Sequence, residues 1–216
     1  MSAAQLTELV RLICEHERLA DMRLHRVYYY DAAPFDGTRD KPLRGGKVDF
    51  KKHEVYAQSR TLHQELRTEP FVALRMGELL FRGWAIDRSK LHRWTPLEHV
   101  ELRAADLKPM FTQKGVDMRL GMDVAALTLK RLVNVIVLVA GDSDFVPAMK
   151  FARREGTQLF LVPLRSPVRD PMLEHADDVL RIAFPTARAE PEAPTETFGR
   201  VAEVPIAIVS STPVKG

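Results

Sequence analysis

The sequence predicts an α/β fold with a mainly parallel central sheet, and three adjoining segments indicate it. Residues 133–140 include the unbroken apolar run 135–139, which is typical of a strand covered on both faces. A helical pattern follows, with apolar residues at i, i+3, i+4 and i+7 from Phe145 to Ala152. Residues 158–163 form a second β-prone run. Strand, helix and strand joined this closely predict a right-handed βαβ unit.

The remaining elements follow from apolar periodicity and from turn residues. We predict helices over residues 4–19, 51–66, 117–131 and 173–182, strands over 24–31, 71–76 and 79–86 (the last two as a hairpin), and a loop over 37–52. Residues 88–107 give no clear pattern. Residues 1–185 then form one domain, and residues 186–216 a Pro-rich linker and C-terminal tail, in which 204–209 suit a short strand or a docking peptide.

Composition limits the class of protein. The chain has 216 residues and 45% hydrophobic residues, which suits one domain with a real core. The single cysteine, Cys14, excludes an internal disulfide and fits a reducing compartment. No apolar run reaches transmembrane length, and no signal-peptide pattern is visible. We therefore expect a cytoplasmic protein with no membrane partner, and a homodimer is compatible with this expectation.

Asp142 is the strongest candidate for a functional residue. It follows a buried strand and precedes a helix, and ligands gather at that edge of open α/β sheets. Gly141 allows a sharp turn before it. Ser143 or Asp144 can cap the helix instead, so a functional role is favoured for Asp142, whereas Asp144 suits a cap and a metal role equally.

Asp117 and Asp123 form a second acidic group. Asp117 stands at the start of a predicted helix, and Asp123 interrupts an apolar stretch, so it lies either on the solvent side or in a site. Six residues turn an ideal helix by about 240° beyond one full turn. The two acids therefore do not share a face, and one must adapt if both reach a single ion.

Clustered carboxylates suggest a hard cation. Without one they repel each other and raise one another's pKa, whereas Mg²⁺ or Mn²⁺ prefers oxygen ligands. Such an ion can orient water and stabilise charge on a phosphoryl group, so acids in basic surroundings indicate phosphodiester hydrolysis. The seven histidines form no His-Glu-x-x-His motif, and no Gly-x-Ser-x-Gly elbow is present.

The net charge of +3 weakly favours a polyanionic partner. Basic residues recur at 41, 44, 47, 51 and 52, and again at Lys150, Arg153 and Arg154. Either set could follow a phosphate backbone, although a solvated face is the ordinary alternative, which we favour for the helical set. Lys114 could also meet phosphate. Ser143 is a further candidate for RNA binding, and with Asp144 it would support the loop and the helix start.

The segments 114–117 (Lys-Gly-Val-Asp) and 137–147, with Asp123 between them, resemble the NYN domain, a branch of the PIN-like nuclease superfamily that includes the LabA/DUF88 group. Residues 28–34 resemble the second-strand region of the bacterial members. The similarity spans about residues 24–183. It implies a PIN-like, Rossmann-like three-layer fold, a Mg²⁺ or Mn²⁺ site, and ribonuclease activity on RNA. The catalytic and metal-binding acids carry over to Asp117 and Asp142, and less securely to Asp123 and Asp144.

One departure from the family concerns the first strand, which usually ends in a metal-binding Asp. No such strand precedes Leu6. Three explanations are open: the start lies too far downstream, residues 206–209 fill the strand position without a matching Asp, or the domain is degenerate and only binds. We favour the first explanation, because loss of a central strand exposes apolar faces and breaks a hydrogen-bond ladder.

Three functions therefore remain open. A metal-dependent endoribonuclease, truncated or impaired, is preferred. A non-catalytic RNA-binding or interaction module is the second, motivated by the missing first Asp. A phosphatase is the third, although no strand-end Asp-x-Asp pair lies upstream of Asp142 to serve as its nucleophile.

Overall fold

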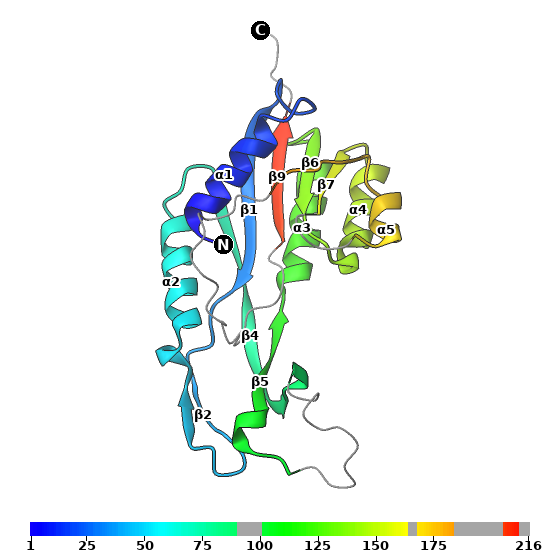
Figure 1. The fold of residues 1–216 in the computed structure, drawn as a ribbon. Coiled ribbons are helices and arrows are strands. Elements are labelled where there is room, and N and C mark those ends of the chain that lie inside the picture. The colour runs from blue at the N-terminus through cyan, green and yellow to red at the C-terminus, as the bar shows by residue number, and fades with distance from the viewer. Residues whose placement is uncertain (90–100, 164–167, 184–204, 212–216) are drawn as a thin grey trace.

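A computed structural model describes residues 1–89, 101–163, 168–183 and 205–211. These residues form an α/β fold around a seven-stranded mixed sheet (Figure 1), which confirms the predicted fold class. In spatial order the strands are β5 (Leu107–Lys114), β4 (Val72–Ile86), β1 (Arg23–Ala32), β9 (Ile206–Ser211), β6 (Val135–Val139), β7 (Gln158–Val162) and β8 (Asp178–Val179). The pairs β1–β4, β6–β7 and β7–β8 are parallel, whereas β9 is antiparallel to both of its neighbours.

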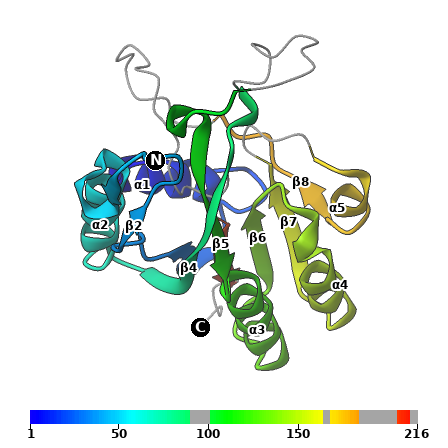
Figure 2. The same cartoon turned by 90° about the horizontal axis from the view of Figure 1, so that it is seen from below.

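Helices cover both faces of the sheet, as Figures 1 and 2 show. One layer contains α1 (Ala3–Cys14) and α2 (Glu54–Leu66), and the other contains α3 (Val116–Leu129), α4 (Val146–Arg154) and α5 (Asp170–Glu174). Short 3₁₀ turns lie at Phe50–Lys52 (η1), Ala104–Asp106 (η3) and Ser143–Phe145 (η4). Sequence and structure therefore agree on a three-layer arrangement.

The two cores explain the apolar runs in the strands. In β1, Tyr28 and Tyr30 face the core beneath α3 and α4, whereas Val27 and Tyr29 face the core beneath α1. Every residue of β6 is buried, and successive side chains alternate between the same two cores. This is the strand covered on both faces that the apolar run predicts.

Strand β9 occupies the central position between β1 and β6. Ile206 pairs with Tyr29 on one side and with Val139 on the other, and the backbone amide of Tyr30 donates to the carbonyl oxygen of Pro205 at 3.2 Å. This is the second of the three arrangements considered for the missing first strand, and not the one that we favoured. The short apolar run after a polar linker gives no indication of which strands it will join.

Several predicted elements were wrong in extent or type. Residues 71–76 and 79–86 are not a hairpin but one strand, β4, whose partner β5 was missed. The loop over 37–52 contains a hairpin, β2 (Thr38–Asp40) and β3 (Lys47–Asp49). The predicted helix over 173–182 is instead the end of α5, which stops at Glu174, followed by β8. Between them, Asp177 accepts the backbone amide of Leu159 at 2.7 Å and ties this segment to β7. The predicted linker over 186–203 lies outside the described residues.

Candidate acidic site at the carboxyl edge of the sheet

The parallel strands bring three predicted acids to one edge of the sheet. Because β1, β6, β7 and β8 run in the same direction, their carboxyl ends lie together, whereas β4, which is parallel to β1, continues beyond this edge. Helix α3 begins at this edge with Asp117 in its first turn. Turn η4 follows β6, with Asp142 as its N-cap and Asp144 in its first turn.

The loop after β6 fixes the direction of Asp142. Its backbone is extended, and its Oδ1 accepts the backbone amide of Asp144 at 3.0 Å. Asp142 is therefore itself a cap, a role that the sequence analysis gave to its neighbours. Both Asp142 and Asp144 are exposed, so their remaining carboxylate oxygens are open to solvent and to ligands.

Asp117 shares an electrostatic environment with the other two acids. Partial burial raises the pKa of Asp117 above its ordinary value, and the nearby charges of Asp142 and Asp144 raise that pKa further. Asp117 comes near the other two acids because the chain turns sharply at Gly115, the N-cap of α3. The φ of Gly115 is 79°, in the left-handed region that glycine adopts without strain. The three carboxylates thus repel one another in the absence of a cation.

Asp123 is held by other partners. It forms an ion pair with Arg75 on β4, with Nε 2.8 Å from Oδ2, and Nη2 donates to Oδ1 at 3.0 Å. The hydroxyl of Tyr30 donates to Oδ2 at 3.1 Å. Both carboxylate oxygens are therefore engaged between α3 and the sheet, and the structure does not bring Asp123 together with Asp142.

The predicted RNA-contacting residues separate into two groups. Lys114 at the end of β5 and Lys150 on α4 are exposed. Arg153 instead donates to Asp177 at 2.9 Å and to the carbonyl oxygen of Glu174 at 3.0 Å, so it joins α4 to the segment around α5. Ser143 accepts a hydrogen bond from Arg169.

The Arg169 contact was missed by the sequence analysis. Its Nη1 donates to Ser143 Oγ at 3.1 Å and brings a guanidinium group to the loop that carries Asp142 and Asp144. No sequence motif signals this contact, because Arg169 lies 26 residues further along the chain. The acidic loop therefore has a positive neighbour that could meet a phosphate group.

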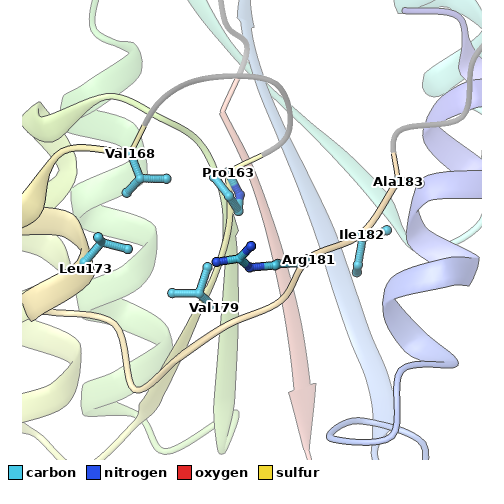
Figure 3. Close-up of a pocket in the computed structure, with 7 residues that line it drawn as sticks. All are labelled: Pro163, Val168, Leu173, Val179, Arg181, Ile182 and Ala183. Atoms are coloured by element: carbon cyan, nitrogen blue, oxygen red, sulfur yellow. The ribbon is translucent and has the colours of Figure 1, made fainter.

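A pocket of about 480 Å³ lies beyond the ends of β7 and β8 (Figure 3). Its walls are mostly apolar, and the Arg181 side chain projects among them. The lining residues are Pro163, Val168, Leu173, Val179, Arg181, Ile182 and Ala183. Val168 adjoins Arg169, so the pocket neighbours the acidic loop.

The donor set limits the kind of metal ion that could bind here. Among the described residues, no three His, Cys, Asp or Glu side chains are arranged to hold an ion. A fully protein-enclosed metal centre is therefore not present in this part of the chain. Exposed carboxylates that repel one another fit Mg²⁺ or Mn²⁺ that keeps water molecules and engages substrate phosphate, because Mg²⁺ is usually bound through one or two carboxylates.

An α/β sheet with carboxylates at the carboxyl edge defines a class of proteins that bind ligands at strand ends. The NYN domain family matches residues 55–182, more than half of the chain, and the chain belongs to this family. No curated protein and no solved structure matches this chain. Membership of the NYN family indicates a nuclease-type protein, in agreement with the PIN-like fold. None of the described helices is both long and apolar enough to cross a bilayer.

Proposed function

We propose that this NYN domain is a divalent-metal-dependent ribonuclease that hydrolyses RNA phosphodiester bonds at the carboxyl edge of its sheet. The observation that carries the proposal is the shared environment of Asp117, Asp142 and Asp144. The family gives a nuclease-type framework, and the acids supply oxygen ligands where this fold class binds ligands.

Asp142 and Asp117 would hold a Mg²⁺ or Mn²⁺ ion, with Asp144 beside them. Such an ion, when bound, would act as a Lewis acid on a phosphoryl oxygen and would lower the pKa of a bound water molecule. The carboxylates would fix its place on the rigid end of β6 and the first turn of α3. Asp123 is left out of this set because Arg75 and Tyr30 engage both of its oxygens.

The basic residues of the site would orient the substrate. Arg169 reaches the acidic loop through Ser143, and Lys114 stands three residues before Asp117. A guanidinium group and an ammonium group on either side of the carboxylates would bind the RNA phosphates through charge-assisted hydrogen bonds. The acids would then lie at one phosphate of the RNA, while Arg169 and Lys114 bind the adjacent phosphates.

Cleavage of a labelled single-stranded RNA tests the proposal. The wild type is assayed with Mn²⁺, with Mg²⁺ and with EDTA, beside Asp142→Asn and the control Asp21→Asn, an exposed aspartate before β1 at the opposite edge. We expect metal-dependent cleavage that only Asp142→Asn abolishes. The asparagine keeps an oxygen that can accept the amide of Asp144, so the fold should persist. Cleavage by Asp142→Asn at the wild-type rate would place the active site elsewhere.

A non-catalytic RNA-binding module is the second candidate, and the direction of β9 favours it. The described residues that enter the central strand at the acidic edge are Pro205 and Ile206, neither of which carries a carboxylate. This alternative predicts salt-sensitive RNA binding that EDTA leaves unchanged, with no cleavage under any metal condition.

A further inference from the structure

A long two-stranded arm extends from the sheet at the acidic edge. Strand β4 pairs with β1 as far as Gly77 and with β5 from Glu78 onwards. The paired part of β4, residues 78–86, is about 25 Å long at the usual rise per residue of a strand. The β2–β3 hairpin packs along it (Figure 1). We call residues 33–53, 78–89 and 101–114 the arm.

An aromatic cluster holds the arm together. Its five rings come from both hairpins, and neighbouring centroids lie 5.4–6.3 Å apart: Phe35, Phe50, Phe81, Trp84 and Phe111. Only Phe50 is buried, and the other four rings are partly open to solvent. The arm therefore presents aromatic surface beside the sheet edge that carries the acids.

Two cations lie on these rings. The guanidinium group of Arg39 is 4.8 Å from the centroid of Phe35 and 5.5 Å from that of Phe81. The ammonium group of Lys41 is 5.5 Å from the centroid of Trp84. The indole Nε1 donates to the carbonyl oxygen of Asp40 at 2.9 Å, which fixes the hairpin between the two cations.

The positive charge of the hairpin is largely uncompensated. Residues 36–52 contain six Lys or Arg residues and three Asp residues. Lys51 pairs with Asp36 at 3.6 Å. In the described part of the chain, no carboxylate lies within ion-pair distance of Arg39, Lys41, Arg44 or Lys47. A ring contact orients a cation without neutralising it, so the full charge remains available to a polyanion.

We propose that the arm is the docking surface for single-stranded RNA and leads the strand to the acidic edge, an inference that rests on the proposed ribonuclease function. Strand β5 ends at Lys114, and Asp117 follows in the first turn of α3. A strand lying along the arm therefore arrives at the carboxylates. Partly exposed aromatic rings and a stacked guanidinium group suit unpaired bases, whose faces are free.

RNA binding by the full chain carrying Asp142→Asn tests this assignment without interference from cleavage. Fluorescence anisotropy of a labelled 12-nucleotide single strand is followed as the KCl concentration is varied. The arm variant adds Arg39→Gln and Lys41→Gln, which remove the positive charge and keep a polar side chain. The control adds Arg26→Gln and Lys130→Gln, which remove the same charge from exposed positions near the opposite edge.

We expect the arm variant to bind about tenfold more weakly than the parent, and the slope of log K against log[KCl] to fall by about 1.4 for two lost phosphate contacts on a single strand. The control should keep the parent's affinity and slope. Equal binding by both variants, or no RNA binding by the parent, overturns the assignment. Duplex RNA that binds with the same arm dependence overturns the single-strand part.

Failure of the two proposals can be told apart. Arm-dependent binding without metal-dependent cleavage by the wild type would refute the ribonuclease and leave the arm as the RNA surface. Metal-dependent cleavage with arm-independent binding would refute the arm assignment alone.

Discussion

The Asp123 carboxylate stabilises the contact between α3 and the sheet, and its removal should weaken the fold measurably. Its side chain is 19% exposed and contacts Arg75, which is 41% exposed, and Tyr30, which is fully buried. Burial, and next the charge of Asp123, raise the pKa of Tyr30 above its ordinary value, so this hydroxyl stays protonated and donates at every physiological pH.

The cost of Asp123→Ala follows from these contacts. Loss of its acceptor leaves the buried Tyr30 hydroxyl unsatisfied, which costs about 1–3 kcal/mol. The ion pair adds about 1 kcal/mol at most, because the Arg75 side chain is 41% exposed. We therefore expect the free energy of unfolding to fall by about 1–4 kcal/mol. Asp123→Asn keeps an oxygen for Tyr30 and should cost only about 1 kcal/mol.

Urea unfolding followed by circular dichroism measures these values, with Asp21→Ala as an exposed control. A double-mutant cycle with Tyr30→Phe isolates the hydroxyl contact, and we expect a coupling of about 1 kcal/mol. A change below about 0.5 kcal/mol for Asp123→Ala, the range of ordinary surface substitutions, with no coupling, would refute this reasoning. Loss of RNA cleavage in a stable Asp123→Asn variant would return Asp123 to the metal-binding set that the sequence predicted.

Three further perturbations test other parts of the structure. Asp117→Asn should raise the thermal midpoint at pH 7, because the pKa of Asp117 is raised in the folded state and its charge opposes folding above that pKa. This gain should fade as the pH falls through the raised pKa towards 3.8, the ordinary pKa of an aspartate, and an equal gain at all pH values would contradict it. Gly77→Ala should cost about 1–3 kcal/mol in urea unfolding, since a Cβ there would lie 2.5 Å from the carbonyl oxygen of Lys114; wild-type stability would refute the close approach. Ile208→Ala should cost about 2–5 kcal/mol, because Ile208 is fully buried in β9, and an unchanged midpoint would show that β9 does not stabilise the sheet.

The sequence predicts those elements whose pattern is local. The run 135–139 and the helical spacing after it suffice for β6, α4 and β7, because burial on both faces and helical amphipathicity each have their own period. The same reasoning places Asp117 and Asp142 at helix starts. The prediction of a helix over residues 173–182 failed because Asp177 ties the segment after α5 to Arg153 and Leu159, which lie on other elements.

Long-range pairing explains the other differences. The arm depends on β4 continuing beyond β1 to pair with β5, and residues 107–110 carry no alternation that signals a strand. The engagement of Asp123 depends on Arg75 and Tyr30, which are 48 and 93 residues away. A solvent-facing acid and an acid pointing into the protein give the same sequence pattern, so the two possibilities could not be separated.

The direction of β9 decides how the acidic site can be built. A parallel strand in this position would end at the acidic edge and could project a carboxylate there, whereas antiparallel β9 begins at that edge with Ile206, which is buried beside Tyr29 and Val139. Among the described residues, the three acids of the site therefore come from α3, which packs on β1 and β4, and from η4, which follows β6, so they flank the central strand without a contribution from it. With so few protein ligands, water and substrate phosphate must complete any coordination shell, and the loss of either Asp117 or Asp142 removes a large share of the protein ligands. Each single Asn substitution should therefore abolish a metal-dependent reaction.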